Sequence, residues 1–246
     1  MTDLAIIGGT GLTKLDTLDI TNREILHTPY GDPSGPICHG ELHGKKVLFL
    51  PRHGYGHTIP PHKINYRANI WALKEAGAQK VLAVAAVGGI TEEMHAGALV
   101  VPDQIIDYTY SRVMTYFEEG LQSVVHIDFT QPYSEALRAS IIQAAKAANI
   151  DIVPKGTYAA TQGPRLETAA EVDRLERDGC HIIGMTGMPE AALARELELD
   201  YATCAVVANP AAGRGIGEIT MQDIEKQLKI GMQKVGSVLQ QLVTLL

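Results

Sequence analysis

The residues best suited to chemistry in this chain lie on one turn that carries Arg52, His53 and His57. The apolar residues 47–50 before the turn are typical of a strand, and a helix is expected from about Ile64. A guanidinium fork matches the oxygens of a phosphate, and an imidazole can add another donor. Ligands of α/β proteins bind beyond the ends of strands, so the turn predicts a small-anion site at a sheet edge. A surface Arg–His pair without a ligand is the alternative.

Two histidines four residues apart also suggest zinc, but that arrangement needs a helix and a nearby carboxylate. Gly54, Gly56 and the prolines at 60–61 exclude a helix here, and residues 46–74 contain no acidic side chain. The sequence therefore argues against a metal ion.

A second glycine-rich turn, Gly8–Gly11, follows the short apolar stretch 4–7. Its backbone N–H groups can approach an anion closely, and Thr10 adds a hydroxyl. The same pattern opens dinucleotide-binding domains, in which a helix and a further glycine follow. Residues 12–21 show neither, so an anion-binding turn is favoured over a dinucleotide site. A structural turn without a ligand is the third possibility.

The composition limits the classes of protein that fit. The chain has 246 residues, a net charge of −7, and 46% hydrophobic residues with only 5% aromatic ones. These numbers suit a large α/β domain and argue against a surface for nucleic acid or anionic membranes. The N-terminus does not resemble a signal peptide, and no apolar stretch approaches the ~20 residues of a membrane span. The cysteines fit no CxxC spacing and indicate reduced core thiols in a cytoplasmic protein: Cys38, Cys180 and Cys204.

Strand and helix patterns alternate along the whole chain, which predicts one domain over residues 1–246 with a central mixed β-sheet flanked by helices. Helices are expected at 64–76, 134–149, from Thr168, 190–199 and from Thr220. Strands are expected at 4–7, 80–87, 156–160, 182–185 and 201–208, with antiparallel strands in 22–50 and a strand pair in 98–106. Two segments lack a regular pattern. Residues 108–131 are expected to form a binding loop or interface, and residues 210–217 a lid.

Four motifs together carry a resemblance to a known family. The segments IIGGTGL, RHGYGHTIPPHKINYRANIWALKEAG, QGPRLETAAE and GMTGMPEAALARE resemble the methylthioadenosine phosphorylase branch of the trimeric purine nucleoside phosphorylases. With Asn209 they run from residue 6 to 209. The resemblance implies the nucleoside phosphorylase fold, a homotrimer, and cleavage of a purine N-glycosidic bond with inorganic phosphate as co-substrate. It implies no metal and no organic cofactor.

The resemblance also implies roles for individual residues. Phosphate would be held by Thr10, Arg52, His53, Thr186 and the backbone near Ala86. Met185 would lie under the ribose, and the base would be framed by Leu166, Glu167, Asn209 and Ala211. Ile219 and Met221 are apolar candidates for the 5′ pocket, although both could equally be core residues at the entry to a helix. His126 would enter the 5′ pocket of a neighbouring subunit. The catalytic residues would be Arg52, His53 and Asn209.

Two positions depart from the family pattern. Adenosine-specific members end the last strand with Asp-x-Asp, where this chain has Asn209 followed by Pro210 and Ala211. An Asn amide can donate to O6 of a purine and accept the N7 proton, which favours a 6-oxopurine. Glu167 can accept the N1–H of hypoxanthine, although it could instead be a first-turn helix carboxylate. Ala85 replaces a threonine that often gives phosphate a hydroxyl.

The expected reaction is therefore phosphorolysis of S-methyl-5′-thioinosine to hypoxanthine and 5-methylthioribose 1-phosphate. A general 6-oxopurine nucleoside phosphorylase acting on inosine and guanosine is the alternative, and methylthioadenosine phosphorolysis is the third possibility. A non-catalytic nucleotide-binding or NAD-dependent protein that uses Gly8–Gly11 belongs to a different class.

Overall fold

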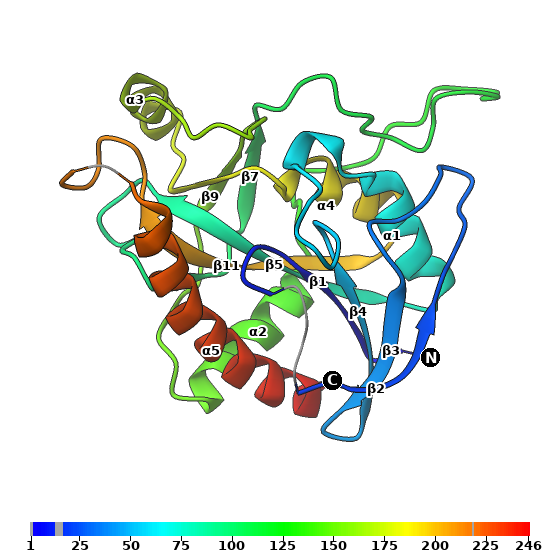
Figure 1. The fold of residues 1–246 in the computed structure, drawn as a ribbon. Coiled ribbons are helices and arrows are strands. Elements are labelled where there is room, and N and C mark those ends of the chain that lie inside the picture. The colour runs from blue at the N-terminus through cyan, green and yellow to red at the C-terminus, as the bar shows by residue number, and fades with distance from the viewer. Residues whose placement is uncertain (1, 13–16, 218) are drawn as a thin grey trace.

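A mixed β-sheet runs through the molecule, with helices on both of its faces (Figure 1). The computed structural model describes residues 2–12, 17–217 and 219–246. In these residues the strands are β1 (Leu4–Gly8), β2 (Asp19–Glu24), β3 (Ile37–Leu42), β4 (Lys45–Pro51), β5 (Lys80–Gly89), β6 (Leu99–Val100), β7 (Gln104–Asp107), β8 (Ile152–Val153), β9 (Thr157–Ala160), β10 (Ile182–Gly184) and β11 (Asp200–Pro210). The helices are α1 (Tyr66–Glu75), α2 (Glu135–Ala147), α3 (Ala169–Arg177), α4 (Gly187–Glu196) and α5 (Met221–Leu245), with a short 3-10 turn at Pro61–Lys63.

The strands follow the order β2-β3-β4-β1-β5-β10-β9-β7, and β11 pairs with both β5 and β6. β1 lies parallel to β4 and β5, and β11 is parallel to β5, whereas β10 is antiparallel to β5. The antiparallel strands expected within 22–50 are confirmed as β2, β3 and β4. The expected pair in 98–106 consists of β6 and β7, which join different partners, and β8 beside β6 is a strand that the sequence did not predict.

Both faces of the central strand β5 are covered, as its unbroken apolar sequence predicted. Val81 and Ala83 belong to the core under α1 and α4, whereas Leu82 and Val84 belong to the core under α2 and α5. Figure 1 shows these two helix pairs on opposite sides of the sheet. The strand ends beyond this packed centre are thereby held in fixed positions.

The helices begin where the capping residues predicted. The side chains of Ser134, Thr168 and Thr220 each accept a backbone N–H in the first turn of α2, α3 and α5, and Thr168 forms a full capping box with Glu171. In α4, Met188 has non-helical backbone angles, so regular helical geometry begins at Pro189. This agrees with the prediction of a proline at the first helical position.

Residues 108–131, called the arm below, contain no helix or strand and extend away from the sheet (Figure 1). Glu196 of α4 anchors the arm by accepting hydrogen bonds from the Thr115 hydroxyl at 2.6 Å and the Tyr116 N–H at 2.8 Å. The three cysteines are buried and unbridged, as expected. Within the described ranges, no helix has the length and apolar character needed to cross a membrane.

Candidate active site

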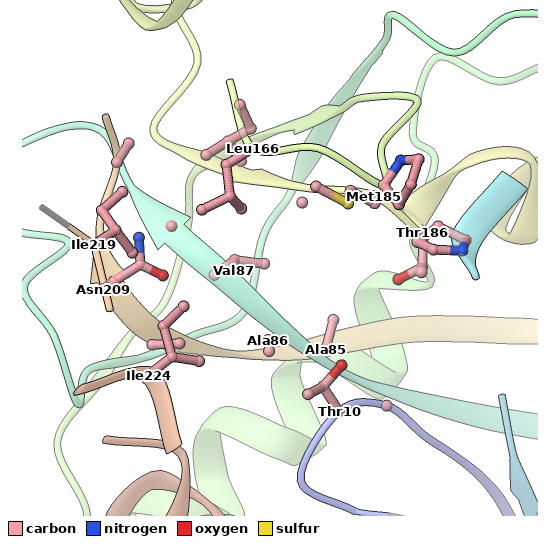
Figure 2. A pocket seen from close by; sticks show the side chains of 18 of the residues that line it. Thr10, Ala85, Ala86, Val87, Leu166, Met185, Thr186, Asn209, Ile219 and Ile224 are labelled. Atoms are coloured by element: carbon pink, nitrogen blue, oxygen red, sulfur yellow. The ribbon is translucent and has the colours of Figure 1, made fainter. Parts of the chain in front are cut away.

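A cavity of about 280 Å³ opens where β1, β4, β5 and β11 end and where β10 leads into α4. It is lined by all but one of the residues that the sequence singled out: Thr10, Arg52, His53, Ala86, Leu166, Glu167, Met185, Thr186, Asn209, Ala211 and Met221. Figure 2 shows Ala85, Ala86 and Val87 of β5 as its floor, with Asn209 on one side and Met185 and Thr186 on the other. The glycine loop of β1 and the turn after β4 thus meet, although about forty residues separate them.

One end of the cavity is lined by hydroxyl groups. In Figure 2 the hydroxyls of Thr10 and Thr186 both point toward the space above Ala85. Ala85 itself offers only a methyl group. Gly9 lets this end of the cavity close tightly, because an added Cβ would lie only 2.9 Å from Nη1 of Arg52.

Arg52 is a buried ion-pair partner rather than a free surface cation. Its Nε and Nη2 donate to the two carboxylate oxygens of Glu190 at 2.6 and 2.8 Å, and Nη1 donates to the Val84 carbonyl at 2.9 Å. The side chains of Arg52 and Glu190 are 1% and 0% exposed. Burial lowers the pKa of Arg52, but the Glu190 carboxylate more than offsets this, and the pKa lies above its usual value. Two of the five guanidinium N–H groups have no acceptor among the described residues, and Arg52 lines the cavity.

His53 is neutral near pH 7. Burial, followed by the charge of Arg52, lowers the pKa of His53 from 6.5 to about 4. Its Nδ1 lies 2.8 Å from the Ile59 carbonyl, which only accepts, so Nδ1 carries the proton and Nε2 is an acceptor. In this neutral state His53 has no second N–H, so the donor role that the sequence suggested would require His53 to take up a proton. The His57 ring lies 4.6 Å from the His53 ring, and no third His, Cys, Asp or Glu completes a metal-binding group in the described part of the chain.

A β-bulge turns Asn209 into the cavity. Along β11, Val207 pairs with Val87, and Asn209 pairs with the next residue, Gly88, so one residue of β11 is left without a partner. In an unbroken register Asn209 would lie opposite Gly89, on the other face of the sheet. The sequence placed Asn209 just past the strand, whereas β11 extends to Pro210. Nδ2 of Asn209 donates to the Pro210 carbonyl at 2.7 Å. Because a carbonyl only accepts, this contact identifies the nitrogen side of the amide, and Oδ1 lies on the other side.

Glu167 and its neighbours form another part of the cavity wall. The Thr161 hydroxyl donates to Oε1 of Glu167 at 2.7 Å, which leaves Oε2 available. Leu166, 47% exposed, and the buried Ala211 supply apolar surface beside it. Three apolar side chains also line the cavity: Ile219, just before α5, and Met221 and Ile224 in its first turn.

His126 is the one predicted site residue outside the cavity. It is exposed on the arm and does not line the cavity of its own chain. A role in a neighbouring subunit stays a prediction.

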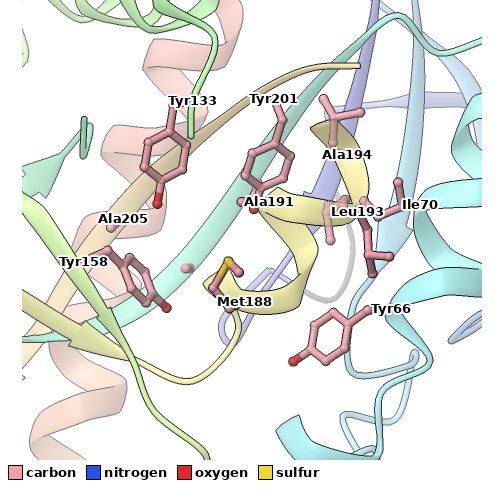
Figure 3. Packing of buried hydrophobic residues seen from close by; sticks show 14 of the residues in the cluster. Tyr66, Ile70, Tyr133, Tyr158, Met188, Ala191, Leu193, Ala194, Tyr201 and Ala205 are labelled. Atoms are coloured by element: carbon pink, nitrogen blue, oxygen red, sulfur yellow. The ribbon is translucent and has the colours of Figure 1, made fainter. Parts of the chain in front are cut away.

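Sequence reasoning missed the residues that support Arg52. Glu190 lies 138 positions away from it, and Tyr201 donates to Oε1 of Glu190 at 2.8 Å. Figure 3 shows Tyr201 beside Ala191 of α4, and Tyr133 and Tyr158 belong to the same buried cluster. The only local signal was an acidic residue directly after a proline at a helix start, and first-turn carboxylates are common there for the helix dipole alone.

Three comparisons agree with this arrangement. A model of the family described as "Phosphorylase superfamily" matches residues 3–244. The protein named "Probable S-methyl-5'-thioinosine phosphorylase" from Pseudomonas syringae pv. tomato is 57% identical over 97% of both chains. The 6-oxopurine nucleoside phosphorylase of Pyrococcus furiosus is 45% identical over 91% of this chain and 85% of its own. A solved structure of methylthioadenosine phosphorylase from Schistosoma mansoni with adenine has a TM-score of 0.96 at 30% identity and covers 100% of this chain and 92% of that one.

Proposed function

This chain belongs to the phosphorylase superfamily, and from that premise we propose that it cleaves S-methyl-5′-thioinosine with inorganic phosphate. The products are hypoxanthine and 5-methylthioribose 1-phosphate. The enzyme is a purine nucleoside phosphorylase formed by one domain over residues 1–246. It needs no metal or organic cofactor and acts in the cytoplasm.

The observation that carries the choice of base is the amide of Asn209 in the cavity wall. As the bond between C1′ and N9 breaks, its electron pair stays on the purine, and N7 takes up a proton from solvent water. Oδ1 of Asn209 accepts this N7–H, and the second N–H of Nδ2 donates to O6 of hypoxanthine. Oε2 of Glu167, another cavity-lining residue, accepts the N1–H. Adenine has an amino group at position 6, so the N–H of Nδ2 would face another hydrogen-bond donor. The unsatisfied donors would cost about 1–3 kcal/mol of binding free energy.

Phosphate binds between the two threonine hydroxyls, with the two uncommitted N–H groups of Arg52 and the backbone near Ala86. A neutral His53 accepts a hydrogen bond from a protonated phosphate oxygen through Nε2, or takes up a proton when the dianion binds. Held beneath the ribose, the phosphate stabilises the positive charge at C1′ and then attacks it. Met185 forms the surface under the ribose.

The 5′ side distinguishes the proposed substrate from inosine. Met221, 64% exposed in the isolated chain, together with Ile219 and Ile224 gives this side an apolar character suited to a thioether. In a homotrimer, His126 of a neighbouring arm completes this pocket. The similarity to the Pyrococcus furiosus enzyme favours a second candidate, a general 6-oxopurine nucleoside phosphorylase.

A spectrophotometric panel with methylthioinosine, methylthioadenosine, inosine and guanosine, each with and without phosphate, tests the proposal. We expect phosphate-dependent turnover with the highest kcat/KM for methylthioinosine. Faster turnover of methylthioadenosine would reject the base assignment, and equal turnover of inosine would favour the second candidate. Base release without phosphate would reject phosphorolysis.

A further inference from the structure

Arg112 lies where two cavity-forming segments meet, and nothing above gives it a role. It belongs to the arm, yet its guanidinium points back into the body of the chain. Nη2 donates to the carbonyls of Thr161 and Gln162 at 3.2 and 2.7 Å, and Nε donates to Oε1 of Gln162 at 3.1 Å. Nη1 donates to the carbonyls of Met185 and Met188 at 2.8 and 2.6 Å. One side chain therefore bridges the segment after β9 and the segment after β10.

Arg112 is held by hydrogen bonds from its planar guanidinium and not by a salt bridge. In the described parts of the chain no carboxylate pairs with it, and all of its acceptors are neutral oxygens. The cation instead lies over the Tyr66 ring, 5.5 Å from the centroid, with Nη1 also 3.3 Å from the Tyr66 hydroxyl. A planar fork with five fixed donors can span two loops at once, which an ammonium group cannot do.

The two bridged segments carry the groups that define the cavity. The carbonyl of Thr161 is fixed by Arg112, and the hydroxyl of Thr161 donates to Glu167 at 2.7 Å. The carbonyl of Met185 belongs to the peptide that leads directly to Thr186. At the strand ends the two segments are also joined directly, because the Thr161 N–H donates to the Gly184 carbonyl at 2.8 Å. Beyond that point Arg112 holds Gln162, Met185 and Met188 together.

We propose that Arg112 is a positioning residue that, together with the Thr161–Gly184 hydrogen bond, sets the distance between the base-binding carboxylate and the ribose-binding peptide. This inference rests on the proposed function, because it assigns the two bridged segments to one bound nucleoside. Arg112 touches neither substrate and acts only through the loops that it holds. A misplacement of about 1 Å between reacting groups can cost about 100-fold in rate, so loss of the bridge should be visible in turnover.

The test compares Arg112→Ala and Arg112→Lys with a matched control, Arg67→Ala. Arg67 also joins the body to the arm, through Glu118 at 2.7 Å, but it contacts neither bridged segment. We expect Arg112→Ala to lower kcat/KM for the nucleoside by about 100-fold. Adding about 50 mM guanidinium chloride should raise the kcat/KM of Arg112→Ala at least tenfold, whereas the same concentration of sodium chloride should not raise it. Arg112→Lys should keep the wild-type Tm within a few degrees yet lose at least about tenfold, and Arg67→Ala should lose less than about threefold.

Each failure has a separate meaning. No phosphorolysis by the wild-type enzyme would reject the proposed function. With an active wild type, full activity of Arg112→Lys, an equal loss in Arg67→Ala, or no recovery of folded Arg112→Ala with guanidinium would overturn the positioning role. If neither Arg112 variant folds, Arg112 serves folding and the inference is also overturned.

Discussion

The buried pair of Arg52 and Glu190 yields a prediction that can be worked out quantitatively. Glu190 accepts two hydrogen bonds from Arg52 and one from Tyr201, at 2.6 to 2.8 Å, with 0% of its side chain exposed. Glu190→Gln removes the negative charge and leaves the cation buried without an anion. Breaking such a pair from one side costs about 3–5 kcal/mol of the free energy of unfolding, and Arg52→Met should cost a similar amount.

The double variant separates the pair from its surroundings. With both charges gone, neither partner leaves an uncompensated charge, so we expect a loss about 3 kcal/mol smaller than the sum of the two single losses. Urea unfolding at 25 °C, followed by the fluorescence of Trp71, measures all four proteins. The protein concentration is held fixed, because an oligomer has a concentration-dependent stability.

An exposed ion pair of the same chain provides the control. Arg67 and Glu118 lie 2.7 Å apart, but Glu118 is 45% exposed, so the cycle of Arg67→Met and Glu118→Gln should give a coupling of at most about 1 kcal/mol. If the losses at Arg52 and Glu190 add to within about 0.5 kcal/mol, the reasoning on burial is refuted.

Three further perturbations have definite expected outcomes. The pKa of His53 is about 4 when folded and 6.5 when unfolded, so its neutral ring contributes stability that is present above pH 6.5 and is lost as the pH falls. In urea titrations, the free energy of unfolding of His53→Gln should therefore fall by about 2 kcal/mol less between pH 7.5 and 5 than that of the wild type. Gly231→Ala drives a Cβ into Val206 and should cost about 1–3 kcal/mol, whereas Gly236→Ala meets open space on the same helix and should stabilise it by up to about 1 kcal/mol. Asn209→Asp should shift the ratio of kcat/KM toward 6-aminopurine nucleosides by about one to two decades.

Each of these has a result that contradicts it. An unchanged pH dependence of stability in His53→Gln would mean that His53 is not held neutral by the fold. Equal effects of alanine at Gly231 and Gly236 would deny the close packing of α5 on β11. A constant selectivity ratio in Asn209→Asp, in an enzyme that still turns over, would remove Asn209 from base recognition.

Local signals in the sequence predicted local structure well. The caps at Ser134, Thr168 and Thr220 depend on residues within one turn, and each helix begins where they indicated. The loops that line the cavity were also found, because each follows an apolar strand pattern whose end is marked by glycine, arginine or asparagine.

Contacts that depend on distant pairing were not predictable. Nothing near Arg52 reveals that Glu190 neutralises it, and nothing near Arg112 reveals its four backbone carbonyl partners. The tautomer of His53 depends on the Ile59 carbonyl, whose direction only the folded turn defines. The two-residue strand β8 has too little sequence to show a pattern.

The irregularity at residues 207–209 of β11 has a consequence for how the cavity wall can vary at position 209. Side chains in a regular ladder are constrained by neighbours on both sides, and exchanging one disturbs the packing of the whole layer. Here the ladder is already interrupted, so the side chain at position 209 can be exchanged with little effect on the strands around it. Straightening the strand without deleting a residue would have the opposite effect: Asn209 would pair with Gly89, and its amide would leave the cavity and enter the apolar interior on the far side.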